Sequence, residues 1–372
     1  MVIAGLPFAL NTFGYSGQGH EAIAEFAHTH LNPKVLEIVD GMLATDSFIA
    51  AIKIKIADPL APPSVKSLPE DDLGKLAVWA DDIKFAKRHM RSTPLLGDAE
   101  TIAFNLNFKS NGDWHFLNLP LATEAFSEKS LFNPDANNVV DVLVGAIHVL
   151  EGQPSGYQFQ DSKGEIIDFT QNQALRLIVH LVGDIHQPLH VGTGFYKLPS
   201  ANGQTTLTLD TNDDSILVTD PSAVISENTK LPNDSGGNAV YPSSLELHAI
   251  WDDVLVQIFA GGTKNSHVLA QKMSKNVSDV QVYLNKDDKC AVIDYHNWPA
   301  LWATDSVHEA KEIYKGITYQ SVDFKPNGTI AKIHVTLPET YRVDQAGRVE
   351  AQLEKAGAHL ALLLNSIHWK IQ

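Results

Sequence analysis

The stretch 171–190 reads QNQALRLIVHLVGDIHQPLH and combines a helical pattern of leucine, isoleucine and valine with histidine and aspartate. His180 and Asp184 are four residues apart, so both side chains project from one face of the predicted helix. The apolar neighbours indicate that the helix is buried, and a buried aspartate is costly unless it is paired or binds a metal. Pro188 ends the predicted helix and directs His190 back from a loop. The stretch therefore predicts a buried helix that carries metal ligands.

The same spacing recurs farther along the chain. His248 and Asp252 are again four residues apart, within the apolar stretch 247–252, LHAIWD. A single His-x-x-x-Asp pair more often forms a structural hydrogen bond, but two such pairs on apolar helices favour a metal site. Other candidate ligands also stand beside apolar residues or glycines: Asp81 after Trp79-Ala80, His115 before Phe116, and His20 after Gly17-Gln18-Gly19.

Apolar periodicity over the rest of the chain predicts a mainly α-helical fold. The expected helices cover residues 19–31, 33–43, 73–89, 138–150, 171–185, 243–260, 264–284, 298–314 and 345–366. Residues 59–69 are rich in proline and are expected to form a loop. The segment 193–235 has two alternating stretches typical of strands and is predicted to be a surface β-hairpin insertion, and 330–337 is also strand-like. We expect one helical domain with these β excursions.

Composition limits the kinds of site that are possible. The chain has 372 residues, 44% of them hydrophobic, which supports a full core. The formal net charge of −16 argues against binding duplex DNA through surface lysines. It leaves open a nucleic-acid enzyme whose positive charge comes from bound metal. The single cysteine, Cys290, excludes an intramolecular disulfide and a multi-cysteine zinc site, so nitrogen and oxygen must hold any zinc.

The N-terminal segment 1–14 is short and mostly apolar, with residues 2–10 as the core of a predicted signal peptide. It lacks the lysine or arginine expected before such a core. Thr12 and Gly14 are small residues at the −3 and −1 positions of a cleavage site before Tyr15. We expect a secreted or periplasmic protein with a domain over 15–372. The alternatives are an uncleaved N-terminal segment and a misassigned start. No apolar run approaches the ~20 residues that span a bilayer.

The order and spacing of these motifs resemble the zinc-dependent single-strand nucleases of fungi and plants. That family shares a superfamily with bacterial zinc phospholipase C, and the resemblance extends from Tyr15 to about Asn365. The matching motifs are Gly19-His20, Trp79-Ala80-Asp81, His115-Phe116, His180-Leu181-Val182-Gly183-Asp184, Gln187-Pro188-Leu189-His190, Gly236-Gly237-Asn238 and Leu247-His248-Ala249-Ile250-Trp251-Asp252.

The resemblance implies a cluster of three zinc ions in a mainly α-helical domain. The first zinc would be held by Asp81, His115, His180 and Asp184. The second would be held by His190, His248 and Asp252. The third would be held by His20, by Asp184 as a bridging ligand, and by the backbone of the first mature residue. That residue is normally tryptophan in the family, whereas the equivalent position here is Tyr15.

The resemblance also implies a reaction and its substrate. A monomeric enzyme of this type would hydrolyse single-stranded DNA and RNA to 5′-phosphate products and show 3′-nucleotidase activity. Asp81, Lys84 and Asp184 would be catalytic, with Lys84 touching the phosphate. Phe116 would stack on a base, and Asn118 and Asn238 would contact a base edge. The competing interpretation of Lys84 is a solvated surface lysine, and that of Phe116 is a phenylalanine packed in the core.

Two other functions compete with the nuclease interpretation. The first is zinc phospholipase C, in which the last ligand of the second zinc is typically glutamate, whereas this chain has Asp252. The second is a non-catalytic zinc-binding protein, against which the complete ligand set argues.

Overall fold

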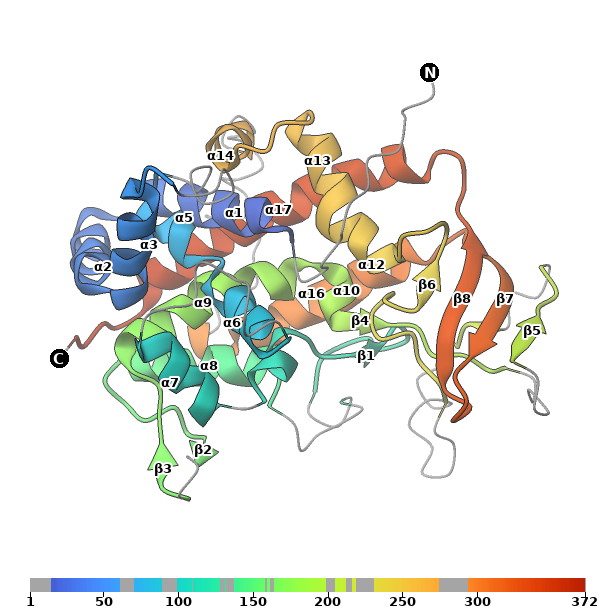
Figure 1. The fold of residues 1–372 in the computed structure, drawn as a ribbon, viewed down its shortest axis with the longest axis horizontal. Helices are drawn as coiled ribbons and strands as arrows, with labels where there is room; N and C mark the ends of the chain where they lie inside the picture. Colours follow the sequence, from blue (N-terminus) through green and yellow to red (C-terminus); the bar gives the residue numbers. More distant parts are fainter. Residues whose placement is uncertain are drawn as a thin grey trace.

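A computed structural model describes residues 15–60, 70–88, 99–108, 110–127, 131, 137–157, 159–160, 164–198, 205–211, 216–218, 231–273 and 294–371. The fold is mainly helical, as predicted (Figure 1). Helix α9 (Gln171–His186) lies among the other helices, and every residue from Gln173 to His186 is buried. It packs against α8 (Val139–Leu150), α16 (Trp298–Ile313) and α17 (Tyr341–Ser366). The stretch with the two best candidate ligands is therefore the centre of the helical core.

Helix α1 (Gly17–Thr29) brings the N-terminal end of the described chain onto the same core. It packs against α17, α14 (Ser266–Met273), α5 (Asp72–Leu76) and α9. Gly357 of α17 permits the close approach of α1, because a Cβ atom there would lie 2.6 Å from the ring of Phe26. Since α1 contacts α9, His20 is carried to the face of α9 that bears His180 and Asp184.

Several helices differ from the prediction in their bounds. The predicted helix 73–89 is two helices, α5 and α6 (Trp79–Arg88). Ala77 lies at the break between the two helices, and its carbonyl accepts a hydrogen bond from Nδ1 of His180. The predicted helix 243–260 begins at Leu247 and consists of α12 (Leu247–Ala249), the π-helical turn η4 (Ile250–Val254) and α13 (Leu255–Ala260).

The predicted loop position of His190 is wrong. His190 lies on the short helix α10 (Pro188–Val191), which starts at Pro188 because proline suits the first turn of a helix. The side chain of Gln187 caps this helix by accepting a hydrogen bond from the backbone N–H of Leu189, at 2.6 Å. Pro188 therefore ends α9 and begins a second helix.

The sequence prediction missed two helices, and parts of it lie outside the described residues. Helix α2 (Pro33–Thr45) was expected, but α3 (Ser47–Ala57) and α7 (Ala99–Asn107) were not. Asp46 caps α3 by accepting hydrogen bonds from two backbone N–H groups. The predicted signal segment 1–14, most of the predicted loop and the part of the predicted helix 264–284 beyond Met273 are not described.

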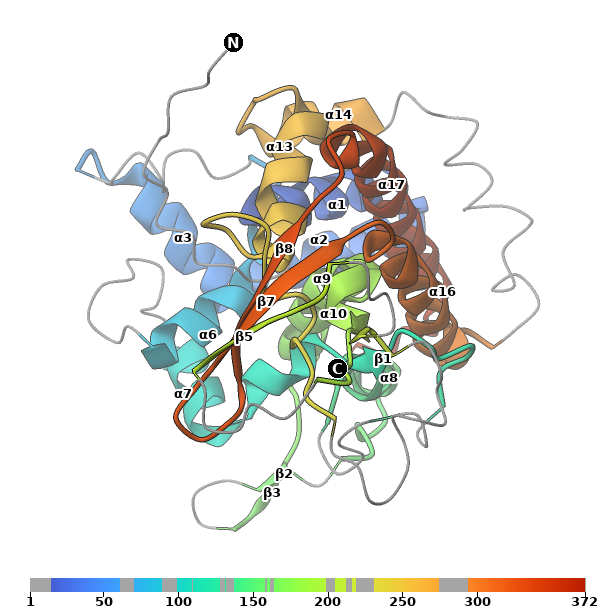
Figure 2. The ribbon, with the colours of Figure 1, turned by 90° about the vertical axis from the view of Figure 1, so that its right-hand side faces the viewer.

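The main sheet lies at one end of the helices (Figures 1 and 2). Its strand order is β5-β7-β8-β6, from β5 (Thr206–Thr208), β7 (Thr318–Phe324), β8 (Ile330–Thr336) and β6 (Val240–Tyr241). Strand β5 comes from the segment 193–235 but pairs antiparallel with β7, which was not predicted. The segment 193–235 therefore forms part of a sheet with the hairpin of β7 and β8, and does not pair only with itself.

The remaining short elements frame the helices. Strand β1 (Leu119–Pro120) runs parallel to β4 (Gly192–Thr193), and β2 (Phe159–Gln160) is antiparallel to β3 (Ile166–Ile167). Two 3₁₀ turns, η1 (Asn111–His115) and η6 (Tyr295–Asn297), precede β1 and α16. The β1–β4 pair joins the chain just after His115 to the chain just after His190, which brings these two candidate ligands together.

Candidate metal centre

Three of the predicted ligands, Asp81, His115 and His180, gather beside a fourth, Asp184. On α9, Nε2 of His180 lies 3.1 Å from Oδ2 of Asp184. His115, at the end of η1, places Nδ1 2.7 Å from the same oxygen. Asp81, in the first turn of α6, lies 3.7 Å from Nε2 of His180 and 3.9 Å from Nδ1 of His115. The structure therefore brings together the four residues predicted to share one metal.

Hydrogen bonds and charge prepare these groups as ligands. Nδ1 of His180 donates to the carbonyl of Ala77 at 2.6 Å, so Nε2 is directed towards the carboxylates. Burial acts to raise the pKa of Asp184, but the charges of His180, His190 and His115 outweigh it and hold that pKa well below its ordinary value. Asp184 is therefore ionised, as a ligand must be.

A second group consists of His190, His248 and Asp252. The rings of the two histidines lie 4.9 Å apart, and Nε2 of His248 is 3.3 Å from Oδ2 of Asp252. Nδ1 of His190 donates to the carbonyl of His115, and Nδ1 of His248 donates to that of Gly236. Both bonds leave Nε2 to face a metal. Asp252 lies in the π-helical turn, a feature often found at functional sites.

His20, predicted to help hold the third metal, lies beside His180 and Asp184. The two rings stack at 4.0 Å, and Nε2 of His20 is 3.4 Å from Oδ1 of Asp184. His20 is fully buried, and burial together with the neighbouring His180 lowers its pKa. Its ring lies against Gly183, where a Cβ atom would be 2.6 Å from Nδ1. Glycine is required at that position for the ring to fit.

Tyr15 is buried beside this group. Its hydroxyl donates to the carbonyl of His186 at 3.0 Å, and its ring lies 6.4 Å from that of His20. The next backbone N–H, that of Ser16, donates to the carbonyl of Asp252 at 2.8 Å. The backbone at Tyr15 thus lies near both histidine–aspartate groups. The predicted ligation by a free amine at Tyr15 stays a prediction.

The chemistry of the donors fits metal ions. Neither ring nitrogen of His20 nor Oδ1 of Asp184 has a hydrogen bond within the described structure, although all three atoms are buried. Such atoms are costly unless a further ligand satisfies them. Within the part of the chain that the structure describes, compact sets of possible ligand atoms occur three times, in His20–Asp81–His180, His115–His180–Asp184 and His190–His248–Asp252. Nitrogen and oxygen donors without thiolate suit catalytic zinc.

The structure describes the side chains of three of the four residues predicted to touch the substrate. Phe116 is half-buried, in contrast to Trp114, which is almost fully buried. Asn118 has a left-handed backbone (φ 56°) and accepts a hydrogen bond from the hydroxyl of Thr193. Asn238 is exposed, and its amide donates to the carbonyl of Ser235. Lys84 lies on α6, but its side chain is not described.

Sequence reasoning missed several residues that support the ligands. Gln187 is fully buried, and its amide donates to Oδ1 of Asp252 at 2.6 Å. Gly183 makes room for His20. Asp234 is fully buried and belongs to the same loop as Asn238. The first two lie between predicted ligands in the sequence, so their position could have pointed to them, whereas Asp234 gave no such signal.

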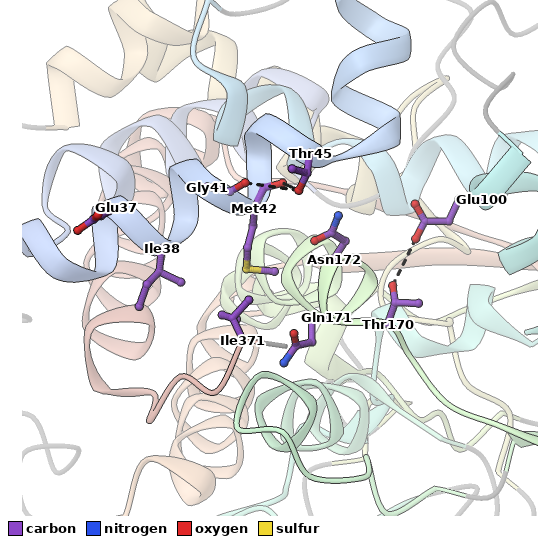
Figure 3. A pocket seen from close by; sticks show the side chains of 10 residues that line it. All are labelled: Glu37, Ile38, Gly41, Met42, Thr45, Glu100, Thr170, Gln171, Asn172 and Ile371. Carbon is purple, nitrogen blue, oxygen red and sulfur yellow. Dashed lines mark hydrogen bonds between the residues drawn. The ribbon is translucent and has the colours of Figure 1, made fainter.

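A pocket of about 520 Å³ lies at the other end of α9, between α2 and the first residues of α9 (Figure 3). Its lining includes Met42, Thr170, Asn172 and Ile371, and Glu100 in the wall accepts a hydrogen bond from Thr170. None of the predicted site residues lines it. The pocket is therefore separate from the metal centre.

Comparison with known proteins gives consistent matches. The model of the family described as S1/P1 Nuclease matches residues 15–368. "Endonuclease 2" of Arabidopsis thaliana is 23% identical over 371 residues, which cover 96% of this chain and 92% of the relative. "Endonuclease 1" of the same plant is 23% identical over 320 residues, covering 84% and 79%. Among the helices that the structure describes, none is long and apolar enough to cross a membrane.

Proposed function

Because this chain belongs to the S1/P1 nuclease family, it is an endonuclease that acts on single-stranded nucleic acid, and we propose that three zinc ions bound to its buried histidines and aspartates are required. The observation that carries this proposal is the carboxylate of Asp184, which is fully buried among four histidines. When bound, zinc lowers the pKa of water towards ~7 and neutralises phosphate charge.

Asp184 is suited to bridge two ions, because its two oxygens face different histidines. Oδ2 lies 2.7 Å from Nδ1 of His115 and 3.1 Å from Nε2 of His180. Oδ1 lies 3.4 Å from Nε2 of His20. Asp81 lies beside His115 and His180 and would bind the same zinc ion as these two histidines. His190, His248 and Asp252 would hold the remaining ion.

Substrate recognition falls to side chains at the edge of this centre. The half-buried ring of Phe116 follows His115 directly and would stack on the base next to the scissile phosphate. Such stacking is worth ~1–3 kcal/mol per base and requires an unstacked base, which favours single strands. Asn118 and Asn238 would contact the base edge, and Lys84 the phosphate. The products would carry a 5′-phosphate, and a 3′-nucleotide would also be a substrate.

The net charge of −16 is consistent with substrate binding through bound metal and the ring of Phe116. A strongly acidic protein repels a polyanion over most of its surface, so binding must depend on local positive charge. The metal centre supplies that charge at the phosphate, while Phe116 adds an uncharged contact. Binding should therefore depend on metal more than on surface lysines.

Maturation of the N-terminus bears on the third zinc site. The family match begins at Tyr15, the predicted first mature residue, and Tyr15 is buried beside His20. A free α-amine at Tyr15 could ligate the third zinc in its neutral form, whereas a peptide nitrogen could not. We therefore expect removal of 1–14 during export to a secreted or periplasmic location. N-terminal sequencing of active enzyme tests this, and full activity with 1–14 attached would contradict it.

The function itself is tested by hydrolysis assays with and without a chelator. The substrates are single-stranded DNA, RNA, a 3′-nucleotide and a lecithin. We expect cleavage of the first three, loss of activity with the chelator and recovery with zinc. Activity on lecithin without activity on single-stranded DNA would identify a phospholipase instead, and zinc binding without any turnover would identify a non-catalytic protein.

A further inference from the structure

Asp234 is an aspartate buried outside the predicted ligand set. It is fully inaccessible to solvent, and its carboxylate accepts four hydrogen bonds. Oδ1 accepts from the backbone N–H groups of Gly194 at 3.2 Å and Gly237 at 3.0 Å. Oδ2 accepts from the hydroxyls of Tyr196 at 2.5 Å and Tyr314 at 2.9 Å. The four partners come from three separate parts of the chain.

The geometry favours the ionised carboxylate. Backbone N–H groups can only donate, and the O–H groups of Tyr196 and Tyr314 both donate to Oδ2, so all four partners act as donors. Burial raises the pKa of Asp234 above its ordinary value, and the hydrogen bonds from Tyr196, Gly237, Tyr314 and Gly194, which favour the ionised form, limit that rise. A charge held this way imposes strict positions on its partners, because each lost donor would leave the buried charge less satisfied.

The loop that Asp234 organises reaches the second ligand group directly. The carbonyl of Gly236 accepts the hydrogen bond from Nδ1 of His248 at 2.6 Å, and the N–H of Gly236 donates to the hydroxyl of Thr193. Gly236 has φ 66°, and a Cβ atom there would lie 2.1 Å from the carbonyl oxygen of Leu189. The loop is thus pressed against α10 beside His190 and has little freedom to shift.

We propose that Asp234 is a positioning residue for the metal group of His190, His248 and Asp252. Its carboxylate, with Tyr196 and Tyr314, fixes the loop 233–238 so that the carbonyl of Gly236 orients the ring of His248. This rests on the metal binding in the proposed function. It also gives the segment 193–235 a role, because both Tyr196 and Asp234 belong to it and connect it to the metal centre.

The test is zinc affinity measured by competition with a chromogenic chelator, using zinc alone as the probe. Asp234→Asn keeps the shape of the side chain but replaces one acceptor oxygen by a donor NH₂ group. We expect one zinc per chain to be bound about 10–100-fold more weakly, as is typical when a residue behind a metal ligand is changed. The zinc ions assigned to the other two groups should keep their affinities.

A matched control separates positioning from general stability. Asp46→Asn removes another buried carboxylate, one that caps α3 and pairs with Arg176. This control should lower the melting temperature without changing zinc affinity. If Asp234→Asn does the same, the proposal is wrong.

Two milder variants keep the proposal testable if Asp234→Asn does not fold. Tyr196→Phe and Tyr314→Phe each remove one of the four donors, so each should weaken the same zinc by several-fold, and the double variant by more. Unchanged zinc affinity in the folded double variant would also overturn the proposal. Failure of the proposed function would look different: the wild-type protein would bind zinc without cutting single-stranded DNA, and the ratio of zinc affinities between variants would still decide the role of Asp234.

Discussion

Gly183 lies between the proposed ligands His180 and Asp184 on α9, and its missing side chain makes room for the ring of His20. Replacing it by alanine adds one methyl group. The new Cβ atom would lie 2.6 Å from Nδ1 and 2.8 Å from Cε1 of His20, and 3.5 Å from Cδ1 of Ile23. Only the last distance is an ordinary contact, so Gly183→Ala acts almost entirely on His20.

The size of the effect follows from these distances. Non-bonded carbon contacts are comfortable at about 3.5–4.0 Å, so the ring must move by roughly 1 Å. The ring of His20 also stacks on that of His180 at 4.0 Å, so moving the His20 ring disturbs this contact as well. Metal–ligand distances tolerate changes of only ~0.2 Å. The movement should therefore weaken the zinc that His20 holds by at least about tenfold.

The effect on stability should be much smaller. Overpacking a buried site costs about 1–3 kcal/mol, whereas alanine is better than glycine in a helix interior by up to ~1 kcal/mol. We expect the free energy of unfolding of Gly183→Ala to fall by ~0–2 kcal/mol. Gly41→Ala is the matched control, because Gly41 lies in α2 with nothing within 4 Å of the new Cβ atom. That control should be neutral or slightly stabilising.

The assay compares zinc content, single-strand hydrolysis and chemical unfolding for the two variants. Gly183→Ala should remain folded but lose one zinc during mild chelation and lose most of its activity, while Gly41→Ala keeps both. Normal zinc content and activity in a folded Gly183→Ala protein would refute the assignment of His20 as a ligand.

Three further predictions concern other residues. Asp184→Ala should reduce activity more than Lys84→Ala, because a bridging carboxylate fixes two ions; near-normal turnover by Asp184→Ala would rule out the bridge. Phe116→Ala should weaken cleavage of nucleotide substrates far more than of a simple diester without a base, whereas a core role would predict equal losses and a destabilisation of ~3–5 kcal/mol. Burial lowers the pKa of His28, but the carboxylates of Asp71 and Asp40 outweigh burial and raise it above the ordinary value of about 6.5. Because the folded-state pKa is raised, the ion pairs of protonated His28 with Asp71 and Asp40 stabilise the folded protein. This contribution is complete below about pH 6.5 and is lost as pH rises through the folded-state pKa. The difference in unfolding free energy between wild type and His28→Gln should therefore shrink as pH rises, and a difference that stays constant with pH would contradict this.

The helical core and the clustering of the candidate ligands were predictable because local spacing encodes them. His180 and Asp184 share a face of α9 by helical periodicity alone, and the surrounding aliphatic residues required that face to be buried. The same argument found His248 and Asp252. How the two groups meet was not encoded locally, because it depends on α10 and on the β1–β4 pair.

The residues that support the candidate ligands could not be predicted, because their contacts also depend on distant parts of the chain. Asp234 sits in a polar, glycine-rich stretch that reads as a surface loop, and only its partners Tyr196 and Tyr314, 38 and 80 residues away, make it a buried carboxylate. Strand β5 likewise finds its partner more than 100 residues later, in β7. Tertiary pairing of this kind leaves no periodic signal in the sequence. Lys84 stays a prediction, because its side chain lies outside the described structure.

The most direct test of the metal centre is the zinc content of the mature protein, measured by elemental analysis alongside cleavage of single-stranded DNA. We predict about three zinc ions per chain, with zinc and activity lost together as a chelator is added or the pH is lowered, because the ligands must be deprotonated to bind. A mature, active protein that holds one zinc or none would contradict the account.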